Sequence, residues 1–96
     1  MAEADVDEQA GYLVDRGGLD LGLRFYDAVM QSVRELASAP GIGELSGFAD
    51  PHLEGVRLFR VSGFEKHLIV YKYDGELLVL RVLHGARDLK RLLDRL

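Results

Sequence analysis

Side chains that can bind anions or transfer protons are concentrated in the second half of the chain. Residues 55–96 hold nine Lys and Arg and five acidic residues, a charge of +4, whereas residues 1–54 carry −8. We therefore expect the second half to be the working surface for an anionic partner, either nucleic acid or an acidic protein segment. The acidic first half is equally well explained by helices with solvated outer faces.

Two overlapping sets of residues in this half are candidates for chemistry. His84 leads the catalytic set, because an unperturbed imidazole titrates near neutrality. The catalytic candidates together are His84, Arg81, Arg87 and Tyr71. The candidates for contacts to a target or to nucleic acid are Arg57, Arg60, Lys66, His67 and Arg87. Their spacing does not show which of them converge.

Several candidates also have a purely structural interpretation. For His84 a hydrogen-bonded residue at the end of a strand is the favoured interpretation. Arg81 lies among apolar neighbours, so it either pairs with a carboxylate or opens onto a functional groove. Arg87 either binds a phosphate or pairs with Asp88 to cap a final helix.

The other candidates lie on expected strands. Arg57 and Arg60 fall on opposite strand faces, so at most one of them points into any single site. Tyr71 is typical of a half-buried packing residue with its hydroxyl at the surface.

Other kinds of chemistry find little support. The chain has no cysteine, which excludes a disulfide scaffold and a thiolate metal site. No His, Asp and Glu cluster has metal-ligand spacing, so no metal or cofactor is expected. Gly41-Ile42-Gly43 lacks the lysine and the strand–helix context of a phosphate loop, and no serine lies in a nucleophile elbow.

The first half of the chain predicts a helical hairpin. Apolar residues recur at helical spacing from Ala2 to Leu13, and Gly17-Gly18 supplies a stop. A second helix is expected from Asp20, as N-cap, to Ala39-Pro40-Gly41. Residues 41–55 read as a glycine-rich loop.

The second half changes to a strand pattern. Strands are expected from Val56 to about Ser62, over residues 68–71 and over residues 77–83, with Asp74-Gly75 as a hairpin turn. Apolar residues of both parities predict that the strand over residues 77–83 is central in the sheet. A short helix is expected from about Asp88. The sequence therefore predicts one α+β domain over residues 1–96, with a helical hairpin on a three-stranded antiparallel sheet and a short C-terminal helix.

This order of elements resembles the RelE/ParE toxin superfamily. The resemblance covers nearly the whole chain and is closer to ParE than to RelE in the helical hairpin and in the closing run. The blocks that carry it are residues 2–8, Arg24-Phe25, residues 36–43, residues 55–61, residues 63–71 and the run Val79-Leu80-Arg81-Val82-Leu83-His84-Gly85-Ala86-Arg87-Asp88.

The resemblance implies the toxin of a type II toxin–antitoxin pair. A ParE-like protein inhibits DNA gyrase by protein contact, blocks replication and growth, need not be an enzyme, and is neutralised by a cognate antitoxin. The net charge of −4 fits a protein target better than ribosomal RNA. A cytoplasmic protein is expected, because the chain lacks an apolar signal segment and a run long enough to span a membrane.

Two alternatives remain open at this point. A RelE-like, ribosome-dependent mRNA endonuclease would need a base, an acid and a cation for the phosphate, which His84 and the basic residues could supply. The other alternative is a decayed toxin that only binds antitoxin.

Family members begin with a strand before the first helix, whereas this sequence starts at that helix. We therefore expect an open sheet edge, with self-association, antitoxin strand addition or marginal stability as its consequence.

Overall fold

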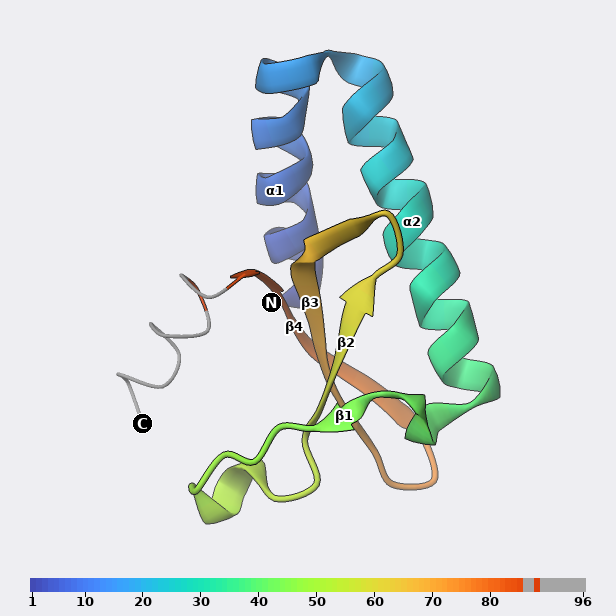
Figure 1. Ribbon diagram of the computed structural model, residues 1–96, viewed down its shortest axis with the longest axis vertical. Coiled ribbons are helices and arrows are strands. Elements are labelled where there is room, and N and C mark those ends of the chain that lie inside the picture. The colour runs from blue at the N-terminus through green and yellow to red at the C-terminus, as the bar shows by residue number, and fades with distance from the viewer. Residues whose placement is uncertain (86–87, 89–96) are drawn as a thin grey trace.

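Two helices stand on one face of an antiparallel sheet (Figure 1). The computed structural model describes residues 1–85 and 88. Helices α1 (Ala2–Gly17) and α2 (Leu19–Ser38) come first, followed by strands β1 (Glu44–Leu45), β2 (Arg57–Val61), β3 (Phe64–Tyr73) and β4 (Leu77–His84), in the sheet order β1-β2-β3-β4. Short 3-10 turns cover Pro40–Ile42 and Pro51–Leu53. The α+β prediction is confirmed, and the sheet has four strands instead of three.

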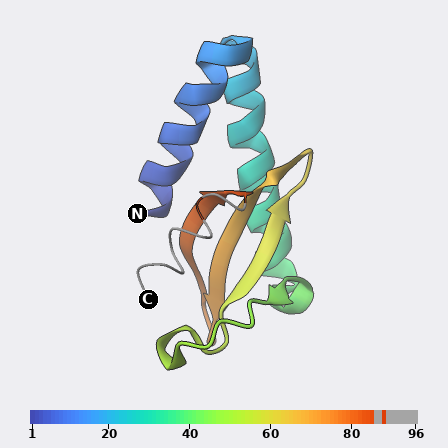
Figure 2. The same ribbon diagram turned by 60° about the vertical axis from the view of Figure 1, so that its left-hand side comes forward.

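The helical hairpin turns at Gly18, whose φ of 88° is readily adopted only by glycine. Helix α2 begins at Leu19, so Asp20 is in its first turn and is not the N-cap. The two helices approach closely at Gly22, where an added Cβ would collide with Val14. The hairpin tip extends past the strands, so its distal half is packed mainly helix against helix (Figures 1 and 2).

The core lies between the helices and the sheet. Phe25, Val29 and Leu36 of α2 pack with residues from α1 and from the strands. The opposite face of the sheet has its own small cluster around Val56, which includes Phe48 and Leu53 from the glycine-rich segment. The segment over residues 41–55 therefore covers the second face of the sheet. It also contains β1, whose two residues are too few to produce a readable alternation.

A register shift explains why the order of strands was not predicted. Strand β4 is at the edge of the sheet, and β3 is central. Tyr71 pairs with Val79 and Val70 pairs with Arg81, which leaves Leu80 as an extra residue. Val79 and Val82 consequently both join the helix-side core despite their opposite parities. The mixed parity of residues 77–83 comes partly from this bulge and partly from burial on both faces at the end of the strand, where Val82 joins the helix-side core and Leu83 joins the cluster around Val56.

The C-terminal predictions cannot be placed in this fold. The expected helix after Asp88 and the candidate Arg87 lie outside the described residues. Within residues 1–85 and 88, neither helix is long and apolar enough to cross a membrane.

Candidate functional site

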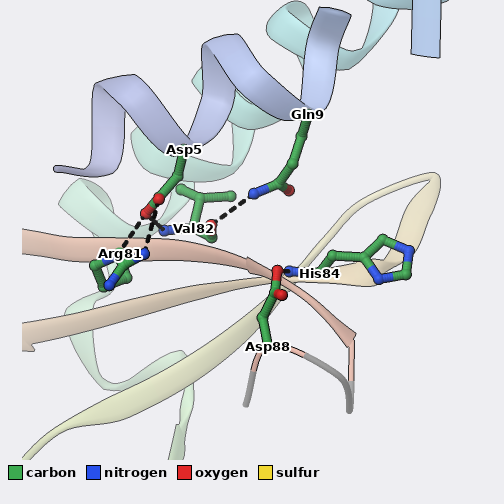
Figure 3. Close-up of polar contacts among 6 residues, drawn as sticks. All are labelled: Asp5, Gln9, Arg81, Val82, His84 and Asp88. Carbon is green, nitrogen blue, oxygen red and sulfur yellow. Dashed lines mark hydrogen bonds and ion pairs between the residues drawn. The ribbon is translucent and has the colours of Figure 1, made fainter. Parts of the chain in front are cut away.

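The first half of helix α1 holds the free edge of β4 through side chains (Figure 3). Asp5 accepts two hydrogen bonds from Arg81, at 2.7 Å from Nε and 2.9 Å from Nη2. It also accepts the backbone N–H of Val82 at 3.0 Å. By accepting these bonds the carboxylate raises the pKa of Arg81, against the opposing effect of partial burial. Arg81 therefore has a carboxylate partner, one of the two roles that its neighbours predicted.

Gln9, one turn further along α1, links this edge to a buried histidine. Its Nε2 donates to the carbonyl of Val82 at 2.7 Å, and its Oε1 lies 2.6 Å from Nδ1 of His67. Because a carbonyl can only accept, the amide orientation is fixed and Nδ1 of His67 must be the donor. The lone pair of His67 is therefore on Nε2.

His67 is enclosed in the core and not exposed at the start of a strand. Only 6% of its surface is exposed, and its ring packs on Phe25 with a centroid distance of 4.6 Å. Burial lowers the pKa of His67 to about 4, with a further contribution from nearby His84 and an opposing one from Asp88. His67 is therefore a neutral imidazole at pH 7.

His84 is the cross-strand partner of His67. The two residues are in register on β3 and β4, and their ring centroids are 5.1 Å apart. The backbone N–H of His84 donates to Asp88 at 2.8 Å, so the residue does end a strand with a hydrogen bond. Its Nδ1 is buried and has no hydrogen-bond partner among the described residues.

The two histidines line a hollow between α1 and the sheet. The hollow has a volume of about 170 Å³ and is also lined by Glu8, Gln9 and Tyr12. It adjoins a groove of about 530 Å³, along which Lys66 lies beside Glu65. The structure thus brings together two imidazoles and one cation, with carboxylates close by. Such a set can exchange protons, and Lys66 is its cation for an anionic group.

Tyr71 and Arg57 form a separate cluster on the helix-side face of the sheet, beside the segment that leads into β1. Tyr71 lies four residues along β3 from His67, roughly 13 Å at the rise of a strand. It is fully buried, donates to the Pro40 carbonyl at 2.6 Å and accepts the N–H of Gly43 at 3.0 Å. Arg57 donates to the Gly43 carbonyl at 2.7 Å. Both side chains hold the start of the glycine-rich segment.

Arg60 lies apart from both clusters. Its guanidinium donates to the Glu65 carbonyl at 2.7 Å, across the turn between β2 and β3. Of the sequence candidates, the structure thus brings together Lys66, His67 and His84, and places Arg57, Arg60, Tyr71 and Arg81 in separate contacts. Among residues 1–85 and 88, no three His, Asp or Glu side chains are grouped closely enough to hold a metal ion.

Four residues of this region were not predicted as site residues, because they lie on α1 and all the predicted candidates lie in the second half of the chain. Their spacing did carry a signal, since residues three and four apart share one face of a helix. What the sequence does not show is that this face lies against the edge of β4. The four residues are Asp5, Glu8, Gln9 and Tyr12.

A second surface, largely apolar, lies on the α1–α2 side of the sheet. It is a groove of about 410 Å³ between the two helices, with β4 as its floor. Glu3 and Asp7 are its acidic residues, and the Tyr26 hydroxyl donates to Asp7 across it. Its apolar lining consists of Ala2, Val6, Tyr26, Val29, Met30, Val33, Val79 and Val82.

Comparison with protein families gives a match over most of the chain. A family model described as "ParE toxin of type II toxin-antitoxin system, parDE" matches residues 1–89. That range includes both helices, the four strands and the histidine pair. None of the curated proteins matches the chain.

Proposed function

Because this chain belongs to the ParE toxin family of type II toxin–antitoxin systems, we infer that it arrests growth by inhibiting DNA gyrase in the cytoplasm. We propose further that a cognate antitoxin neutralises it. The family match over residues 1–89 carries this proposal. Inhibition by protein contact needs a shaped surface and no catalytic group in this chain.

Among the described residues, the hydrogen bonds of three arginines on the strands support a protein target over RNA. The guanidinium groups of Arg57, Arg60 and Arg81 all donate to groups of their own chain. A protein that holds RNA phosphates needs cations that are available to them. The net charge of −4 also favours a protein target over RNA.

A purified-component assay tests the gyrase proposal. Increasing amounts of the protein should inhibit supercoiling of relaxed plasmid by gyrase, while mRNA in a coupled translation reaction stays intact. Adding the antitoxin, taken as the product of the adjacent reading frame, should restore supercoiling. Unaffected supercoiling at a large excess of folded protein would contradict the proposal.

The apolar groove between α1 and α2 is the proposed seat of the antitoxin. Apolar side chains of an antitoxin segment would fill it, and basic residues beside them would meet Glu3 and Asp7. Ala2 lines the groove, whereas Ala4 is exposed and does not. Ala2→Trp should therefore weaken antitoxin binding in calorimetry by at least about tenfold, and Ala4→Trp should not. Equal affinities would place the antitoxin elsewhere, for example along the edge of β4.

One observation favours a second candidate function, cleavage of mRNA on the ribosome. His67 and His84 lie with their rings 5.1 Å apart in a groove that also contains Lys66. If the protein is a nuclease, translation-dependent cleavage should be lost in His84→Ala and kept in His52→Ala, because His52 lies in the exposed loop. A folded protein that binds antitoxin but affects neither gyrase nor mRNA would be a decayed toxin.

A further inference from the structure

Helix α2 carries two apolar stripes, one buried in the core and one that reaches the core only at its last residue, Val33. The buried stripe consists of Gly22, Phe25, Val29, Ser32 and Leu36. The second, which we call the outer stripe, consists of Leu19, Leu23, Tyr26, Met30 and Val33. Both stripes alternate steps of three and four residues, which is the apolar repeat by which helices pack along one another in coiled coils.

The outer stripe is exposed along most of its length. The exposed fractions are 66% for Leu19, 53% for Leu23, 37% for Tyr26 and 51% for Met30. Its first residues lie in the distal half of the hairpin, which extends past the strands (Figures 1 and 2). A row of large apolar side chains on a solvent-exposed surface marks a protein contact more often than an accident of composition.

Charges beside the outer stripe indicate what covers it. Asp20, Asp27 and Arg34 follow Leu19, Tyr26 and Val33 by one position, so they form one flank of the stripe. The flank is acidic at the start of α2 and basic at its end. A copy of the same helix in antiparallel orientation therefore presents Arg34 to Asp20 and Asp20 to Arg34, as two-fold symmetry requires. Within one chain Asp20 pairs with Arg24 at 3.1 Å, and this exposed carboxylate would accept Arg34 of the second copy as an additional partner.

We propose that two copies of this chain pair through the outer stripes of α2, antiparallel, into a four-helix bundle made of both hairpins. Leu19 and Leu23, near the tip of one hairpin, then pack against Val33 and Met30, nearer the base of the second copy's α2. Tyr26, Met30 and Val33 also line the antitoxin groove, so a second copy and an antitoxin would compete for these three residues. Leu23 is not part of that groove, which lets the pairing be tested independently of antitoxin binding.

Sedimentation velocity between about 1 and 100 µM tests the pairing. The chain should pass from monomer to dimer over this range, and Leu23→Glu should shift the transition by at least about tenfold in concentration. Leu78→Glu is the matched control, because Leu78 is a similarly exposed leucine on β4. A chain that stays monomeric throughout, or that is affected only by Leu78→Glu, would overturn the proposal.

Charge reversal separates self-pairing from any other contact of the stripe. Asp20→Arg and Arg34→Asp should each weaken the dimer, and the double variant should restore it, because both reciprocal pairs are then inverted. Asp27 lies near the two-fold axis opposite its own copy, so Asp27→Asn should strengthen the dimer. Failure of the double variant to recover would show that these flanks do not face each other.

The absence of cysteine allows a direct proximity measurement. Under mild oxidation, Leu23→Cys should form a disulfide-linked dimer and Leu78→Cys should not. Crosslinking only of the Leu78→Cys variant would assign self-association to the sheet edge. A monomeric Leu23→Cys variant whose new thiol resists alkylation would show that the stripe is covered within one chain. Either result would contradict the proposal.

Discussion

Asp5 serves two partners at once, a guanidinium and a backbone N–H. It binds Arg81 through both oxygens and also accepts the N–H of Val82. Its side chain is largely buried, whereas the Arg24–Asp20 pair on α2 is exposed on both sides. The Asp5–Arg81 pair therefore contributes more to the free energy of unfolding than the Arg24–Asp20 pair, because exposed ion pairs contribute little.

Replacing Asp5 by Ala should lower the free energy of unfolding by about 2–3 kcal/mol, because it leaves both donors without their partner. Asp20→Ala should cost less than about 0.5 kcal/mol, since that pair is solvated. Urea unfolding followed by circular dichroism measures both variants. Equal effects would show that the contacts of Asp5 at the strand edge are not structural.

The buried His67 predicts a dependence of stability on pH. Its pKa is about 4 in the folded chain and about 6.5 when unfolded, so the unfolded chain binds more protons between these values. Stability is therefore full above pH 6.5 and falls as the pH decreases toward 4, by at most about 3 kcal/mol from this residue. Urea unfolding at several pH values should show a smaller decline for His67→Gln. An NMR titration midpoint of His67 near 6.5 would contradict this account.

At the scale of elements, a helix or strand could be predicted from the sequence where its apolar residues repeat regularly over a sufficient length. The two helices were readable because their apolar residues repeat at helical spacing over many turns. Strand β1 was not, because two residues carry no period. The edge position of β4 was hidden by the bulge at Leu80 and by the burial of Val82 and Leu83 on opposite faces. The histidine site depends on Gln9, which belongs to an element distant in sequence. Local periodicity predicts elements, while contacts between elements depend on register.

Strand β1 offers a test of such a contact. Tyr71→Phe removes the acceptor of the Gly43 N–H and the donor to the Pro40 carbonyl, so a buried amide is left unpaired. We expect a loss of about 1–3 kcal/mol, with faster amide exchange over residues 42–45. Tyr73→Phe is the control, because Tyr73 is half exposed. Unchanged exchange in Tyr71→Phe would mean that β1 is held by its strand pairing alone.

At the scale of the whole molecule, packing density is uneven along the hairpin. The bases of both helices lie against the sheet, while the tip around Gly18 extends past it (Figure 2). Elements with few tertiary contacts open locally at a lower free energy than the global transition. The stability of the tip should therefore depend on what binds there.

Hydrogen exchange on the dilute protein should show amides of residues 12–22 at least about tenfold less protected than those of residues 25–36. Pairing through the outer stripe should raise protection at the tip as the concentration increases, and Leu23→Glu should abolish that rise. Uniform protection along α2 at low concentration would contradict the uneven packing.

The contacts of Asp5 also constrain how this sequence can change over evolutionary time. If Arg81 is replaced first, for example by Met, Asp5 keeps the N–H of Val82 as a partner. If Asp5 is lost first, the guanidinium and the N–H are both left unpaired at the sheet edge. The two orders of substitution are therefore unequal. Among descendants of this chain, lineages that have lost the arginine and kept the aspartate should outnumber those with the reverse combination.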